Sequence, residues 1–261
     1  PLRLTCTTAG EHTLRFEGLA LVNGAAAAVG GGIYCQFSGD SAGTVTFAGC
    51  EIADNRVTAP TGANHGGGGL YWDGRATGSP TLVLRDCTVA RNAVLLNAAA
   101  STYGRGGGMY LRSGNVLIAD SGILDNRTHR ESGGLHLLDV NLVVRRSEIA
   151  GNGRIAPHPN RSGAFEATGG SQVLVEESTL RGNRTDGYGG ITWLSSGTAG
   201  VTVRNSLIVG NVGNRAGAFN VENGKLSLQN CTLVGNQATP SSGAGGVRIT
   251  GGSTYITNSI I

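Results

Sequence analysis

The chain has almost no lysine, few aromatic residues and no long hydrophobic run. Lys225 is the only lysine among 261 residues, aromatic residues make up 5% and charged residues 14%. This composition argues against a highly charged disordered chain and against a charged helical protein. No apolar run approaches the roughly 18 residues of a transmembrane helix, so we expect no membrane span in this segment. With a net charge of only +3, we expect no nucleic-acid partner.

Cysteine is sparse too, and its spacing fits no metal or redox motif. The five cysteines include no C-x-x-C pair, which argues against a zinc knuckle and a thioredoxin-like site. Cys50 and Cys87 occupy equivalent positions of two successive repeats and lie within disulfide reach, so the sequence allows either a bond or two stacked thiols. We predict no metal site and no cofactor. Calcium stays open as a cofactor, although no cluster of acidic residues indicates it.

Glycine, in contrast, is abundant, and much of it recurs in one phrase. The chain contains 45 glycines. The phrase joins adjacent glycines to a short apolar strand: GGGIYCQF (30–37), GGGGLYWD (66–73), GGGMYLRS (106–113), SGGLHLLD (132–139), GYGGITWL (187–194) and GAGGVRIT (243–250). A second phrase of the type TLVLRDCTVARN alternates with it and ends in an asparagine: Asn23, Asn55, Asn92, Asn126, Asn152, Asn183, Asn211 and Asn236. The chain is therefore built from repeats.

The two phrases predict the winding of each repeat. Both have the period of two that is typical of strands, while the insertions between successive asparagines fall outside them. Fixed strands with variable loops are typical of a solenoid. We therefore predict an all-β fold, a right-handed single-stranded parallel β-helix of about eight coils with three short strands per coil. It would form one domain over residues 1–261, with 1–29 as a first, irregular coil and 30–261 as regular coils.

Other repeat folds fit less well, and the asparagines support the β-helix. A leucine-rich repeat needs L-x-x-L-x-L spacing, and a propeller needs four strands per blade. Turn asparagines that tolerate the left-handed conformation and bond to the backbone of the next coil would form a ladder along the solenoid. We expect the glycines to supply positive φ angles at the corner before the following strand.

The repeated G-G-[ILM]-Y and the N-S-x-I-x-x-N of RNSLIVGN and TNSII resemble the right-handed β-helix repeats of pectate-lyase-like proteins. The chain is most similar to polymorphic outer-membrane proteins and autotransporter passengers. This resemblance implies a bacterial protein that is secreted or displayed at the cell surface, and a segment of a longer chain that adjoins further β-helix segments or copies. It leaves the function open, because the scaffold also supports lyases, hydrolases and adhesins.

One column of side chains suggests a binding surface. In the strand after the glycines, we expect the outward residues to form an aromatic strip that a glycan could stack on. The rings could equally stack on one another beneath the loops or pack against another domain. Arginines in the neighbouring loops would form a basic rim suited to an acidic polysaccharide. The predicted ligand-binding residues are Tyr34, Tyr71, Tyr110, His136, Phe165, Phe219, Arg105 and Arg161.

Catalysis has weaker support in the sequence. We find no paired aspartates of the polygalacturonase type and no acidic calcium cluster, so the weak catalytic candidates are His129, Arg130, His136 and Tyr110. Glu166 falls on the inward parity of its strand; it is either a buried general acid or turned outward by a local bulge.

We therefore expect a binding, adhesion or display segment that interacts with a glycan. The alternatives are a polysaccharide lyase or glycoside hydrolase acting on an acidic polysaccharide, and a structural stalk or filament protein.

Overall fold

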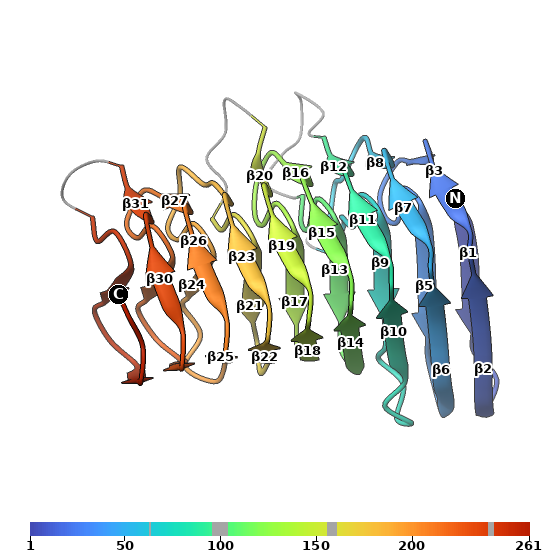
Figure 1. Ribbon diagram of the computed structural model, residues 1–261. Coiled ribbons are helices and arrows are strands. Elements are labelled where there is room, and N and C mark those ends of the chain that lie inside the picture. Colours follow the sequence, from blue (N-terminus) through green and yellow to red (C-terminus); the bar gives the residue numbers. More distant parts are fainter. Residues whose placement is uncertain (63, 96–103, 156–160, 240–242) are drawn as a thin grey trace.

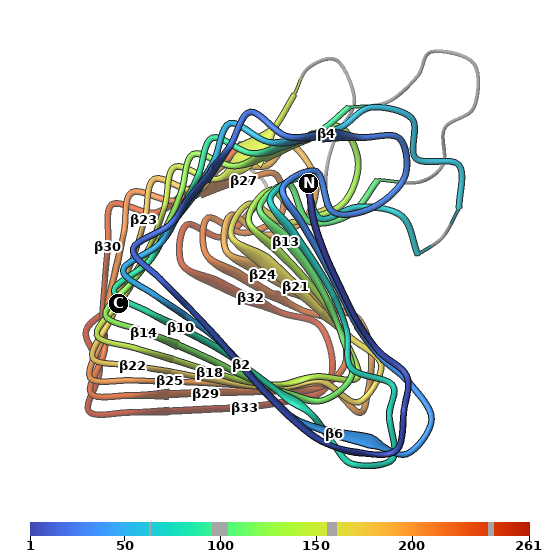
Figure 2. The same cartoon turned by 90° about the vertical axis from the view of Figure 1, so that its right-hand side faces the viewer.

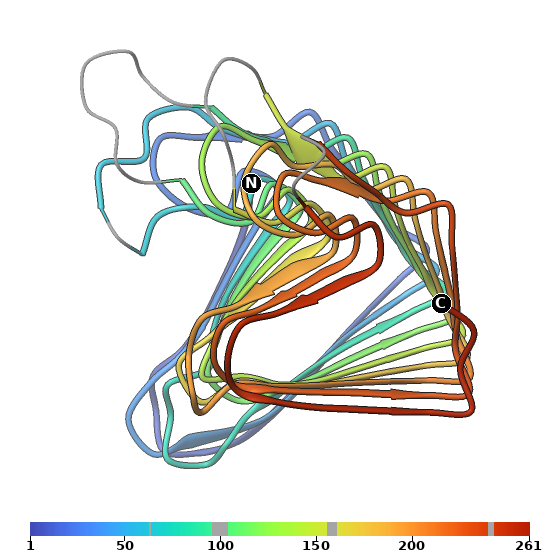
Figure 3. The same cartoon turned by 90° about the vertical axis from the view of Figure 1, so that its left-hand side faces the viewer.

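The computed structural model describes residues 1–62, 64–95, 104–155, 161–239 and 243–261. Its strands all pair in parallel with the equivalent strands of neighbouring coils (Figure 1). Viewed along the axis, the coils enclose a triangle with three walls (Figures 2 and 3). The predicted right-handed parallel β-helix with three main strands per coil is confirmed. None of the described residues belongs to a helix long and apolar enough to cross a membrane.

Each wall consists of one class of strand. The first wall holds the strands after the glycines: β1 (Leu2–Cys6), β5 (Ile33–Phe37), β9 (Leu70–Asp73), β13 (Met109–Arg112), β17 (Leu135–Leu138), β21 (Phe165–Thr168), β24 (Thr192–Leu194), β28 (Phe219–Val221) and β32 (Val247–Ile249). The second wall holds β2 (Gly10–Glu17), β6 (Ser41–Ala48), β10 (Thr81–Arg85), β14 (Asn115–Ala119), β18 (Asn141–Arg145), β22 (Gln172–Glu176), β25 (Gly200–Arg204), β29 (Lys225–Gln229) and β33 (Ser253–Thr257).

The third wall and the corner after it complete each coil. The third wall holds β3 (Ala20–Val22), β7 (Glu51–Ala53), β11 (Thr88–Ala90), β15 (Gly122–Leu124), β19 (Glu148–Ala150), β23 (Thr179–Arg181), β26 (Leu207–Val209) and β30 (Thr232–Val234). Two-residue strands follow the asparagines: β4 (Ala25–Ala26), β8 (Arg56–Val57), β12 (Ala93–Val94), β16 (Arg127–Thr128), β20 (Gly153–Arg154), β27 (Val212–Gly213) and β31 (Gln237–Ala238).

The core consists of like side chains stacked along the axis. Leu84, Ile118 and Val144 occupy the same position in successive strands of the second wall and are fully buried. Because every second residue of each wall faces the interior, the apolar side chains of all three walls meet in one continuous core. Along the second and third walls the alternating apolar residues, such as Leu84 and Val89, are fully buried.

The asparagine ladder holds the corner after the third wall. Asn126 Oδ1 accepts hydrogen bonds from the backbone N–H and from Nδ2 of Asn92, both at 3.0 Å. Its own Nδ2 donates to the Val89 carbonyl at 2.9 Å and to Asn152 Oδ1 at 3.0 Å. The ladder is as predicted, but the left-handed residue is mostly the one before the asparagine, for example Asp125 with φ 54°.

Glycines at the next corner allow neighbouring coils to approach closely. The first glycine of some phrases has the expected positive φ, as in Gly106 with φ 60°. Gly68 has another role, because a Cβ there would lie 2.3 Å from the Gly107 carbonyl oxygen. Backbone contact therefore requires glycine at this position.

Two expectations about the coils need correction. Residues 1–29 are not irregular, because β1 to β4 all pair in register with the strands of the second coil. In the first wall, Phe165 and Phe219 do not point outward. Both are fully buried in the core. The physical reason is that Ala164 and Ala218 occupy the place of the second glycine, so the strand positions begin one residue earlier than expected and Phe165 pairs in register with the inward Leu135.

The cysteines are free thiols. Cys50 and Cys87 stack in one buried column without a bond, and the Cys50 backbone N–H donates to Cys87 Sγ at 3.4 Å. Each thiol donates to a backbone carbonyl two residues earlier, at 3.3 Å for Cys50 and 3.1 Å for Cys87. The cysteines therefore act as small core residues that also satisfy local carbonyl groups.

Candidate functional site

The outward rings of the first wall form a continuous stack. The ring centroids of Tyr34 and Tyr71 lie 5.5 Å apart, those of Tyr71 and Tyr110 5.1 Å, and those of Tyr110 and His136 5.1 Å. Tyr110 and His136 are fully buried and Tyr71 is 5% exposed. The Tyr110 hydroxyl donates to Asn64 Oδ1 at 3.2 Å, so the segment before Gly66 covers the stack. Burial also raises the pKa of Tyr71 and Tyr110.

This geometry changes the interpretation of the aromatic strip. Tyr34, Tyr71, Tyr110 and His136 lie on the outer face of the sheet as predicted, but only Tyr34 at the end of the stack is partly exposed. Arg3 covers the Tyr34 ring at 4.6 Å. The rings therefore stack on one another beneath covering segments, which was the alternative to an open glycan groove.

The outward column continues with polar residues. Glu166 stands beside His136 in the register of β17 and β21, and Asn220 pairs with Arg248 further along. Glu166 thus lies on the outer face, as the bulge interpretation required, but it pairs in regular register with His136 and no bulge is involved. It is fully buried under the segments that cover this face.

A second column runs parallel to the first at the glycine corner. It consists of the residue immediately before the first glycine, or before the residue that replaces this glycine, in successive coils: Arg105, Glu131, Arg161, Tyr188 and Arg215. Charge alternates at its start, since Arg105 Nε lies 3.3 Å from Glu131 Oε2 and Arg161 Nη1 lies 3.6 Å from Glu131 Oε1. At its end the Arg215 guanidinium lies 4.4 Å from the Tyr188 ring centre.

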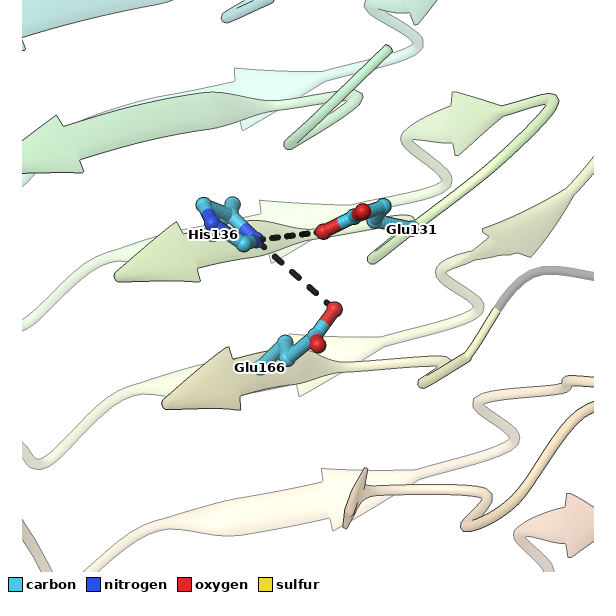
Figure 4. A group of neighbouring side chains, drawn as sticks. All are labelled: Glu131, His136 and Glu166. Carbon is cyan, nitrogen blue, oxygen red and sulfur yellow. Dashed lines mark ion pairs between the residues drawn. The ribbon is translucent and has the colours of Figure 1, made fainter. Parts of the chain in front are cut away.

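Three buried groups from the two neighbouring columns converge: Glu131, His136 and Glu166 (Figure 4). His136 Nδ1 lies 3.5 Å from Glu131 Oε2 and 3.7 Å from Glu166 Oε2. These separations exceed ordinary hydrogen-bond lengths. All three atoms are buried and none has a hydrogen-bond partner among the described residues. We call these three residues the Glu–His–Glu cluster.

Two arginines neutralise the carboxylates of this cluster. Arg161 Nη1 lies 3.3 Å from Glu166 Oε1 as well as near Glu131 Oε1. Arg105 lies on the other side, with Nη1 3.5 Å from His136 Nε2. Burial pushes the pKa of Glu166 upward, but His136 and Arg161 beside the carboxylate hold it below its ordinary value. Glu166 is therefore held in an ion pair with Arg161 on the outer face of the first wall.

Arg161 also lines an open pocket of about 410 Å³. We call it the arginine pocket; its lining is Arg130, Arg161, Asp186, Gly187, Tyr188, Asn214 and Arg215. The Tyr188 and Trp193 rings stack with centroids 4.0 Å apart. Arg161 lies over Trp193 at 5.4 Å. The stacked rings thus support the guanidinium groups of Arg161 and Arg215 at the pocket wall.

A second basic hollow of about 330 Å³ adjoins the first, with Arg127, Arg154 and Arg184 in its lining. Arg154 forms an ion pair with Asp186, which lines the arginine pocket, so the two hollows share this pair as a boundary.

Another hollow, of about 480 Å³, lies on the outer face of the second wall above Gly200. Its lining is mostly apolar and Lys225 is its single charged residue. It holds no cluster of reactive groups. The arginine pocket and the Glu–His–Glu cluster are therefore the candidate site.

The structure gathers some of the predicted site residues and separates others. Arg105, Arg161 and His136 meet in or beside the cluster, Tyr110 stacks on His136, and Arg130 lines the pocket. His129 is partly buried just after β16. Phe165 and Phe219 belong to the core. Glu131 and Tyr188 were missed, although their constant offset from the glycines was a signal that could have identified them.

Comparison with known families agrees with this fold. A family model described as a right-handed β-helix region matches residues 31–261. No curated protein and no solved structure matches the chain.

Proposed function

Because the chain belongs to the right-handed β-helix family, whose scaffold supports many activities, we propose its function from the site: it binds an acidic glycan in the arginine pocket. The observation that carries the proposal is that Arg130, Arg161 and Arg215 line one open pocket with a single carboxylate, Asp186. Guanidinium groups recognise carboxylates through two parallel hydrogen bonds.

The arginines keep donors available for a ligand. Arg161 uses Nη1 for both buried carboxylates, and a guanidinium has five N–H donors in all. Arg130 has no carboxylate within ion-pairing distance among the residues that the structure describes. The Tyr188–Trp193 stack and the Glu–His–Glu cluster hold the other guanidinium groups in place, which lowers the entropic cost of binding.

The size of the pocket fits a small part of a polymer. A volume of about 410 Å³ lies in the range of small-molecule sites. We propose that uronate units of an extracellular polysaccharide occupy it, and that the protein acts in adhesion or display at a cell surface. His136 and Glu166 are fully buried behind Arg161, so we expect binding without cleavage.

Calorimetric titration with trigalacturonate at low salt tests the proposal. We expect saturable binding that is lost with the methyl-esterified trisaccharide. Arg130→Gln and Arg215→Gln should each weaken binding about 10- to 100-fold, since a hydrogen bond to a charged group contributes roughly 1.5–3 kcal/mol.

Arg181→Gln is the matched control, because Arg181 is an exposed arginine that pairs with Glu148 on the third wall. Equal binding of the methyl ester, or an equal loss in the control variant, would contradict the proposal. Absorbance of unsaturated uronate in the same samples would reveal a lyase.

A further inference from the structure

We infer that the Glu–His–Glu cluster is a binding site for a divalent transition metal ion of the zinc class. Within the described part of the chain, this is the place where three such groups bring their ligand atoms within 4.8 Å of one another. The inference stands on the geometry of these three side chains and does not depend on glycan binding.

The distances suit an ion better than direct hydrogen bonds. Two ligands at 2.0–2.2 Å from a tetrahedral ion lie about 3.3–3.6 Å apart. The measured separations of His136 Nδ1 from the two Oε2 atoms are 3.5 and 3.7 Å. All three atoms are buried without a hydrogen bond. Burying polar atoms in this state destabilises the fold, unless an ion bound between the three atoms ligates them.

The donor set selects the class of ion. One imidazole nitrogen and two carboxylate oxygens suit zinc, iron or cobalt, whereas calcium takes six to eight oxygen ligands. Three protein ligands would leave a coordination position for water or an anion.

The surroundings orient the ligands as metal sites require. Arg161 contacts Oε1 of Glu131 and Oε1 of Glu166, so it fixes both carboxylates while leaving each Oε2 free. Tyr110 stacks on the imidazole and fixes its plane. Such outer contacts typically change metal affinity by about 10- to 100-fold.

Arg105 would compete with the ion for the carboxylate of Glu131. Its Nε lies 3.3 Å from Glu131 Oε2, one of the three ligand atoms, and its Nη1 faces His136 Nε2. When Nδ1 of a histidine binds a metal, Nε2 carries the proton, so it and the Arg105 donor would repel each other. The Arg105 side chain is 21% exposed and can turn outward when an ion enters.

Titration of the chelator-treated full chain with Co²⁺, followed by visible absorption, tests the inference. We expect one ion per chain with the intense bands of a low-coordinate site, and stoichiometric displacement by Zn²⁺ but not by Ca²⁺. Glu131→Gln and Glu166→Gln should weaken binding at least tenfold, and Arg161→Gln about 10- to 100-fold. Arg105→Met should strengthen it.

The controls separate a lost ligand from a lost fold. Glu176→Gln removes a carboxylate that pairs with Arg204 on the second wall and should leave binding unchanged. Because unfolding would expose the buried cysteines, which also bind Co²⁺, each variant is first compared with the native protein by circular dichroism, and stronger binding by a folded Arg105→Met cannot come from misfolding. Absence of binding in both the native chain and Arg105→Met would overturn the inference, as would native affinity in the two Gln variants.

Discussion

The asparagine ladder gives the sharpest prediction about stability. Replacing Asn126 by alanine removes four hydrogen bonds, two accepted by Oδ1 and two donated by Nδ2. Each buried bond contributes roughly 0.5–1.5 kcal/mol, and the Asn92 backbone N–H and the Val89 carbonyl lose partners in a dry interior. We therefore expect Asn126→Ala to lower the free energy of unfolding by about 3–5 kcal/mol.

Urea unfolding followed by circular dichroism measures this loss. Asn141→Ala is the matched control, because Asn141 is exposed and makes a single side-chain bond, to Asn115 at 3.3 Å. That change should cost less than about 0.5 kcal/mol, as is usual for surface positions. Equal effects of the two substitutions would refute the reasoning that the ladder, and not local strand propensity, stabilises the corner.

Three further predictions test the corner, the core and the charge pairs. Gly68→Ala should cost about 1–3 kcal/mol in urea unfolding, because its Cβ would meet backbone atoms at 2.3 Å, whereas Gly197→Ala has open space and should be nearly neutral. Burial raises the pKa of Cys35 to about 12, so this thiol should react with a disulfide reagent only after unfolding; rapid reaction of the native protein would contradict that. The pKa of Glu222 lies below its ordinary value, because the opposing effect of burial is outweighed by the hydrogen bonds to its carboxylate and by the charge of Arg215. The carboxylate of Glu222 therefore stabilises the fold above about pH 4.3, and this stabilisation is lost as the pH falls through the folded-state pKa. Glu222→Gln should therefore show a smaller loss of stability than the native protein on acidification below about pH 4.3, and equal losses would contradict this.

The winding could be predicted from the sequence because its signals are backbone requirements repeated in every coil. The walls and their register could be predicted from the repeated phrases that end at Asn55, Asn92 and Asn126 and from the alternating apolar residues within them. The position of Phe165 could not be predicted in the same way. Ala164 occupies a position that is glycine in other coils, so the sequence allows two alignments of this strand that differ by one residue. Only the hydrogen bonds to the neighbouring coil show which alignment is adopted.

The candidate site was only partly predictable. Arg105 and Arg161 were identified as a basic rim, but their partner Glu131 lies in a segment of variable length and sequence. The burial of Tyr110 and His136 depends on how the covering segments fold back, which the period of the strands does not encode. The strands specify which face a side chain occupies, whereas the loops decide whether that face meets solvent.

The chain offers a direct test of the arginine pocket, because its two tryptophans stand in different environments. Trp72 is fully buried in the core, and Trp193 stacks on Tyr188 beside Arg161. In a nitrogen-15 heteronuclear NMR spectrum, we expect trigalacturonate to shift the indole N–H signal of Trp193 progressively to saturation while that of Trp72 stays fixed. An unmoved Trp193 signal at saturating ligand, or equal shifts of both signals, would contradict acidic-glycan binding at this pocket.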